Sequence, residues 1–162
     1  MQNIVYLSLG SNVGDRLANL STAIERLKSV GEIVGVSSFY ETEPVEFTAQ
    51  PWFINGGVKL NTEKTPDQLL VEILQIEQHM GRQRTQAKGP RAIDIDILLF
   101  GDSVINTKDL TIPHPAMQKR RFVLEPLAEI APDVQHPVLQ QTIQELRDAL
   151  PAGQAVRKIV GH

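Results

Sequence analysis

The chain has 162 residues, a length typical of a single domain, since most domains contain about 100–200 residues. Hydrophobic residues make up 41% and charged residues 22%, as in ordinary globular proteins. The formal net charge of −3 excludes a uniformly basic nucleic-acid binder. The absence of cysteine excludes a disulfide framework, a thiolate zinc site and a cysteine nucleophile. No targeting segment or membrane-length apolar run is present, so we expect one cytoplasmic domain spanning residues 1–162.

Apolar periodicity predicts four strands and two helices in the first hundred residues. The strands are expected at 4–9, 33–40, 53–60 and 93–100, with a loop at 41–50 and another at 82–91. The first helix begins near Asp15 and ends by Gly31, and the second begins at Thr65-Pro66 and ends at Gly81. The adjacent glycines Gly56-Gly57 indicate a bulge or a close approach of the backbone.

The resulting order, β-α-β-β-α-β, is that of the ferredoxin-like fold. From Ser103 onward the chain carries six prolines, which predict loops and short helices that wrap the sheet, one of them near 140–150. The predicted fold class is therefore α+β, with a ferredoxin-like core and a C-terminal extension of loops and short helices.

Two aspartates stand at alternate positions of the fourth strand. Side chains at i and i+2 share one face of a strand, so Asp94 and Asp96 point together while Ile93, Ile95 and Ile97 face the core. Two neighbouring carboxylates repel, and a divalent cation removes the repulsion; Mg²⁺ is commonly held by carboxylates, water and phosphates. The alternative is an edge strand that keeps both acids in water, although aspartate is unfavourable in strands.

A cationic loop directly precedes this strand. Between Gln78 and Ile93 no residue is acidic, and the basic side chains are His79, Arg82, Arg84, Lys88 and Arg91. Guanidinium groups bind phosphate oxygens in pairs, so the loop and the aspartates together predict a site for Mg²⁺ and a polyphosphate. A basic loop alone would be interpreted as a solvated surface.

His114 lies between two prolines and shortly before Lys119-Arg120-Arg121. It is either a donor to phosphate or an ordinary turn histidine, and the sequence leaves both open. Gly10-Ser11-Asn12 is either a plain turn or a source of backbone N–H groups for an anion. No nucleotide-binding P-loop, dinucleotide fingerprint, nucleophile elbow or zinc-protease motif is present.

Several motifs in order along most of the chain resemble those of the 6-hydroxymethyl-7,8-dihydropterin pyrophosphokinase family. The motifs are Leu9-Gly10-Ser11-Asn12; Ser37-Ser38-Phe39-Tyr40-Glu41-Thr42-Glu43-Pro44; Gln50-Pro51-Trp52-Phe53-Ile54-Asn55; Ile76-Glu77 with Gly81-Arg82-Gln83-Arg84; Gly89-Pro90-Arg91-Ala92-Ile93-Asp94-Ile95-Asp96; Leu110-Thr111-Ile112-Pro113-His114-Pro115; and Arg120-Arg121-Phe122-Val123. The resemblance implies a ferredoxin-like enzyme of folate biosynthesis that uses ATP and two Mg²⁺ ions to transfer pyrophosphate to the pterin alcohol, releasing AMP.

The same resemblance implies roles for individual residues, each at a position that matches a family motif. Asp94 and Asp96 would hold both metals. Catalysis would rest on these aspartates with Arg82 and Arg91. The ATP-binding residues would be Glu77, Arg82, Arg84, Arg91, His114 and Arg120. The pterin pocket would be formed by Thr42, Val45, Phe53, Asn55 and Phe122.

Three other functions remain to be weighed. A ferredoxin-like RNA-binding module would need exposed aromatic residues and a broad basic face, whereas this strand carries Asp94 and Asp96. A Mg²⁺-dependent phosphohydrolase would use the same aspartates on water, and a non-catalytic protein would bind pterin or nucleotide without turnover. We expect ATP and the pterin as the partners, no nucleic acid or membrane, and a monomer.

Overall fold

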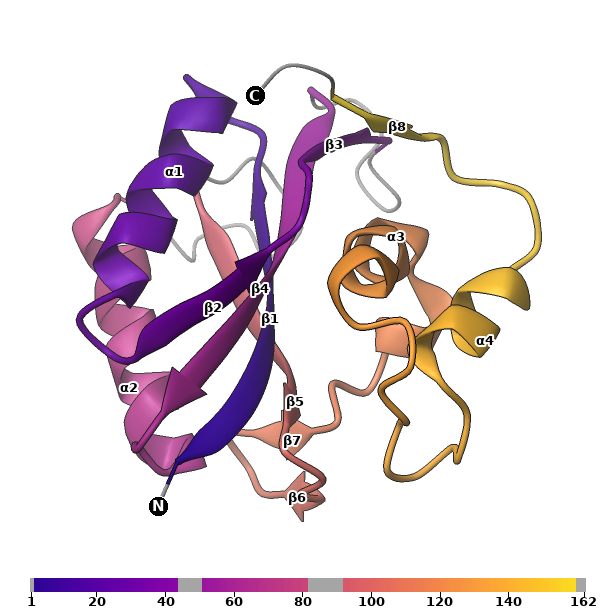
Figure 1. The fold of residues 1–162 in the computed structure, drawn as a ribbon. Coiled ribbons are helices and arrows are strands. Elements are labelled where there is room, and N and C mark those ends of the chain that lie inside the picture. The colour runs from indigo at the N-terminus through magenta and orange to yellow at the C-terminus, as the bar shows by residue number, and fades with distance from the viewer. Residues whose placement is uncertain (1, 44–50, 82–91, 160–162) are drawn as a thin grey trace.

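The computed structural model describes residues 2–43, 51–81 and 92–159. In these ranges a mainly antiparallel sheet lies between two layers of helices, with α1 and α2 on one face and α3 and α4 on the other (Figure 1). None of the described helices has the length and apolar character needed to span a bilayer. The predicted mixed α+β class is confirmed.

The sheet is built around two long central strands that pair with each other. The strands are β1 (Asn3–Ser11), β2 (Glu32–Val36), β3 (Tyr40–Thr42), β4 (Phe53–Thr62), β5 (Asp94–Phe100) and β8 (Val156–Lys158). Their order is β5-β1-β4-β3-β8, with β2 also paired to β4, and all these pairings are antiparallel. Seven of the nine residues of β1 are buried, because helices cover both faces of this strand (Figure 1).

The first helical layer begins at two capped helix ends. Helix α1 (Arg16–Leu27) starts where the Asp15 carboxylate accepts from the N–H of Ala18, and α2 (Pro66–His79) starts at a capping box of Thr65 and Gln68. Their apolar faces pack on the sheet and enclose the larger hydrophobic core. Its fully buried members include Leu7, Leu20, Leu60, Ile73 and Ile93.

The second layer comes from the C-terminal third of the chain. It contains α3 (Arg121–Ile130), α4 (Ile143–Asp148) and a short 3-10 helix at Met117–Lys119. The separate two-stranded sheet of β6 (Ile105–Asn106) with β7 (Thr111–Ile112) instead contributes Ile105 and Ile112 to the larger core. Leu98 and Leu99 of β5 join Leu124 and Leu127 of α3 in a second core. The two cores place β5 and β1 between both helical layers.

Three predictions about the strands need correction. The first strand does not end at Leu9, because Gly10 and Ser11 still pair with β4. The predicted strand at 33–40 is two strands, since at Ser37 the chain leaves the β2 ladder and the Ser37 side chain accepts from the N–H of Gly57. The expected loop from residue 41 begins later, because Glu41 and Thr42 belong to β3.

Gly56-Gly57 marks a close approach and not a bulge. The pairing of β1 with β4 runs through both glycines without a shift. A Cβ on Gly56 would lie 2.8 Å from the ring of Phe39, and one on Gly57 would lie 3.6 Å from Pro126 of α3. The two glycines therefore let Phe39 and α3 pack directly on β4.

The C-terminal extension does contain short helices, including α4 inside the predicted 140–150 region, but α3 and β8 were not predicted. Pro126 lies inside α3, where it removes one helical hydrogen bond. Its burial against Gly57 offsets this loss. Strand β8 is three residues long, too short for a sequence pattern.

Candidate active site

Asp94, Gly10, Asn55 and Tyr40 form one row across the sheet. Gly10 pairs with Asp94 of β5 on one side and with Asn55 of β4 on the other, and Asn55 pairs in turn with Tyr40 of β3. Directly paired residues of antiparallel strands share a face. The predicted metal ligand and the predicted pterin residue therefore project to the same side of the sheet, the side that α3 covers.

The aspartates of β5 have the arrangement that the sequence predicts. Asp94 and Asp96 are half-buried and alternate with the buried Ile95 and Ile97. On the α2 side, the N–H of Ile95 donates to Glu77 Oε2 over 2.9 Å. Glu77 is only 3% exposed, so it holds the start of β5 against α2 and thereby orients the strand that carries both aspartates.

A cleft runs beside these carboxylates. One part has a volume of about 740 Å³ and is lined by Glu77, Asp94 and Asp96 with apolar residues of α2. A second part of about 270 Å³ shares Asp96 and Leu70 with the first and extends to Thr111 and His114. A cleft lined by apolar side chains and a few charged groups is typical of small-molecule sites.

His114 is held as a neutral hydrogen-bond donor. Its backbone N–H donates to Leu98 O over 3.0 Å, and its Nδ1 accepts from the N–H of Ala116 over 3.2 Å. Since Nδ1 accepts, the ring proton is assigned to Nε2. Burial and the positive charge of Arg120 lower the pKa of His114 to about 4, while Asp94 acts in the opposite direction. At neutral pH the ring is therefore uncharged and offers one N–H.

The predicted pterin residues lie at the other end of the row. Thr42 Oγ1 donates to Asn55 Oδ1 over 2.5 Å, and Asn55 Nδ2 donates to Leu9 O over 3.3 Å. Asn55 is 4% and Thr42 is 1% exposed. These two bonds fix the orientation of the Asn55 amide. A fixed amide can form specific hydrogen bonds with the edge of a heterocycle.

The two aromatic residues of the predicted pterin pocket come from β4 and α3. Phe53 precedes Asn55 by two positions on the same face of β4, and a Cβ on Gly10 would lie 3.6 Å from its ring. Phe122 is half-buried in the first turn of α3, and the Arg120 guanidinium lies 5.5 Å from its ring centroid. The described part of the site thus has one carboxylate end and one amide-and-aromatic end.

Comparison with known proteins agrees with this geometry. The model of the 7,8-dihydro-6-hydroxymethylpterin-pyrophosphokinase (HPPK) family matches residues 6–132. The chain belongs to this pyrophosphokinase family. A 2-amino-4-hydroxy-6-hydroxymethyldihydropteridine pyrophosphokinase of Aquifex aeolicus is 45% identical over 143 residues, which cover 88% of this chain and 89% of that protein. Its counterpart from Bacillus subtilis is 45% identical over 83% of this chain and 82% of its own length.

Other relatives of the chain are much longer. The folic acid synthesis protein fol1 of Schizosaccharomyces pombe is 46% identical over 92% of this chain, which spans only 21% of that protein. The crystal structure of Plasmodium falciparum HPPK-DHPS A437G with STZ-DHP has a TM-score of 0.75 and 20% identity over 91% of this chain and 45% of that chain. This last similarity shows the fold.

Four predicted site residues, Val45, Arg82, Arg84 and Arg91, lie outside the described residues. Within the described ranges, no three histidine, aspartate or glutamate side chains gather into a metal cluster. Two carboxylates on one strand nevertheless suit Mg²⁺, which keeps several waters and completes its shell with substrate phosphates. Asp94 and Asp96 therefore fit the metal that the family resemblance implies.

Proposed function

We propose that the chain transfers pyrophosphate from ATP to the hydroxymethyl group of 6-hydroxymethyl-7,8-dihydropterin, and that it does so along the Asp94–Gly10–Asn55 row. The observation that carries the proposal is that Gly10 pairs with both other residues. Two strand spacings separate Asp94 from Asn55, about 10 Å. A pterin bound at Asn55 can therefore reach a phosphate held near Asp94.

The nucleotide would occupy the cleft beside β5. His114 offers a neutral N–H and Arg120 a positive charge, while Leu70 and Ile97 supply apolar surface for the base. Arg82, Arg84 and Arg91 are proposed as further phosphate ligands from the motif resemblance alone. Glu77 would act by holding β5 in place, because its carboxylate accepts from the N–H of Ile95.

Asp94 and Asp96 are the proposed ligands of Mg²⁺, with two ions in the complete site. When bound, Mg²⁺ neutralises triphosphate charge and favours displacement at phosphorus. The half-buried position of the two carboxylates on one face of β5 supports this assignment.

The pterin would be read by Asn55 and Thr42 at its edge and by Phe53 and Phe122 at its faces. Stacked aromatic rings suit a flat heterocycle. In the proposed step the hydroxymethyl oxygen forms a bond to the β-phosphorus of ATP, and the bond from that phosphorus to the α–β bridging oxygen breaks. AMP leaves with the bridging oxygen, and the hydroxyl proton passes to solvent.

The proposal extends to three further points. The core is ferredoxin-like, which is supported by the position of β4 between β1 and β2 and of β1 between β4 and β5. The protein is a monomer, and it is cytoplasmic.

The decisive experiment combines the protein with ATP, Mg²⁺ and 6-hydroxymethyl-7,8-dihydropterin and identifies the released nucleotide. AMP that forms only when the pterin is present establishes pyrophosphoryl transfer. ADP and phosphate, with or without the pterin, would instead identify a phosphohydrolase. Tight pterin binding without turnover would identify a non-catalytic binding protein.

A further inference from the structure

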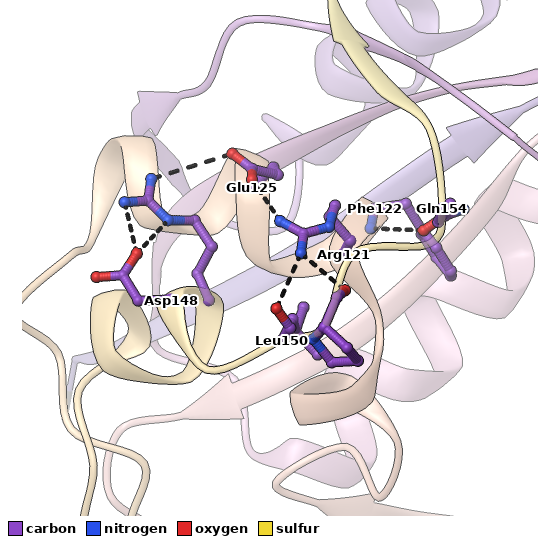
Figure 2. Close-up of polar contacts among 8 residues, drawn as sticks. Arg121, Phe122, Glu125, Asp148, Leu150 and Gln154 are labelled. Carbon is purple, nitrogen blue, oxygen red and sulfur yellow. Dashed lines mark hydrogen bonds and ion pairs between the residues drawn. The ribbon is translucent and has the colours of Figure 1, made fainter.

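The C-terminal segment 150–158 lies beyond residues 6–132, which match the family model, yet it contacts the proposed pterin end of the site. Strand β8 pairs with β3, and Val156 stands opposite Thr42. The same segment also passes the first turn of α3, which carries Phe122 (Figure 2). It therefore joins two elements that supply different pterin residues.

The side-chain amide of Gln154 connects these two elements. Its Nε2 donates to the backbone oxygen of Glu43, the residue after Thr42, over 2.5 Å. Its Oε1 accepts from the backbone N–H of Phe122 over 3.3 Å, the bond drawn in Figure 2. The first N–H groups of a helix have no partner within the helix, and Arg120, which precedes α3, makes no capping bond with its side chain. Gln154 supplies an acceptor from 32 residues away.

The segment is anchored on both sides of Gln154. On the α3 side, the Arg121 guanidinium donates to Leu150 O and Pro151 O and pairs with Glu125 (Figure 2). On the β3 side, the N–H of Glu43 donates to Ala155 O over 3.0 Å, and the N–H of Ala155 donates to a Glu43 carboxylate oxygen over 3.1 Å. The Gln154 amide therefore links β3 to the first turn of α3, and a shift of either element would break or stretch one of its two hydrogen bonds.

We propose that Gln154 is a positioning residue for the pterin substrate, because it sets the separation between Phe122 on α3 and Thr42 on β3. The inference rests on the proposed function, since it takes these residues as the pterin site. An amide is suited to this role because it donates and accepts at once. Both hydrogen bonds of the Gln154 side chain go to elements of the pterin end, Glu43 and Phe122, so its effect falls on the pterin and not on ATP.

The test uses two variants of the full chain whose side chains at position 154 are similar in length to glutamine. Gln154→Met removes donor and acceptor together, whereas Gln154→Lys keeps a donor for Glu43 and leaves the N–H of Phe122 unpaired. Loss of two hydrogen bonds that orient the pocket is expected to weaken pterin binding about tenfold in Gln154→Met. Gln154→Lys is expected to lose less pterin affinity than Gln154→Met. The KM for ATP should not change in either variant. Gln144→Ala, at an exposed glutamine of α4, is the matched control and should bind pterin like the unaltered protein.

Pterin affinity is measured by titration calorimetry with a non-hydrolysable ATP analogue and Mg²⁺ present, and the midpoint of thermal unfolding is measured alongside. Equal pterin affinity in Gln154→Met and the unaltered protein would overturn the inference. A rise of both KM values together with a lower unfolding midpoint would also overturn it, because that result indicates a purely structural role. Absence of pterin binding by the unaltered protein would instead contradict the proposed function.

Discussion

Gly10 and Asn55 are paired directly across β1 and β4, and the space over Gly10 is filled by the Asn55 amide. A Cβ on Gly10 would lie 2.5 Å from Asn55 Nδ2, closer than any real contact of a Cβ atom. Asn55 cannot move freely, because Thr42 donates to its Oδ1 and its own Nδ2 donates to Leu9 O. The Asn55 amide can occupy this position only because residue 10 is a glycine. The proposed pterin site therefore depends on Gly10.

Gly10→Ala is expected to displace Asn55 and to weaken pterin binding at least tenfold. The steric conflict should also lower the free energy of unfolding by about 1–3 kcal/mol, as overpacked core positions do. Gly35→Ala is the control, because a Cβ there would meet Lys59 only at an ordinary 3.4 Å. Calorimetric titration with the pterin and chemical denaturation measure the two effects. Unaltered pterin affinity in Gly10→Ala would show that Asn55 does not read the substrate.

Asp94→Ala and Asp96→Ala should each abolish turnover while the protein stays folded. Both carboxylates are only half-buried on the edge strand β5, so their removal leaves the cores intact. Loss of a preorganised charge at a reacting phosphate typically costs on the order of 100–1,000-fold in rate. Asp102→Ala, at the exposed turn after β5, should retain full activity. Release of AMP measures turnover and circular dichroism measures folding; retained activity in either β5 variant would remove the argument for Mg²⁺ at these residues.

The parts of the fold that the sequence predicts are those with strong local signals. Helix α2 has a capping box at Thr65 and ends near Gly81, which has a positive φ of 85°. Alternation of isoleucine with Asp94 and Asp96 predicts both the strand and the side that the carboxylates face. These features depend on neighbours in the chain, so a single sequence is enough to find them.

The unpredicted parts depend on contacts between distant segments. Pro126 is a helix breaker by local rules, but its burial against Gly57 of β4 makes it acceptable inside α3. Gln154 has no pattern around it, because its partners are Glu43 and Phe122. Gly10 is predicted to follow the first strand, whereas it lies within β1 and leaves space for Asn55. No local signal in the sequence reports such contacts.

His114 should titrate at about pH 4 in the Mg²⁺-free protein, well below the ordinary 6.5. Since burial lowers the folded pKa, the unfolded chain binds the proton first as the pH falls. The stability that comes from a neutral His114 is thus fully present above about pH 6.5 and is lost toward pH 4, a change on the order of 2 kcal/mol.

Nuclear magnetic resonance of the histidine rings measures this pKa directly. Denaturation between pH 4 and 7 measures its consequence for stability, with His114→Gln as the comparison. The variant should lose less stability than the unaltered protein over this range. Burial also lowers the pKa of His136. This effect is the same in both proteins, so it cancels when their stabilities are compared. A His114 ring that titrates near pH 6.5 would contradict the buried, Nδ1-accepting arrangement.

Tyr40→Phe should destabilise the contact between β3 and α3. Tyr40 Oη donates to Glu129 Oε2 over 2.6 Å, and Glu129 also accepts from the N–H of Ser38 and pairs with Lys158. Burial alone would raise the pKa of Glu129, but these donors outweigh it and hold the pKa below its ordinary value.

The ionised form of Glu129 therefore adds stability above about pH 4.5 that disappears as the pH falls through the folded pKa. Removal of the Tyr40 hydroxyl should cost about 1–2 kcal/mol at pH 7, measured by denaturation, and less at a pH low enough to protonate Glu129 in both proteins. An equal loss at both pH values would show that the charge on Glu129 does not strengthen the bond.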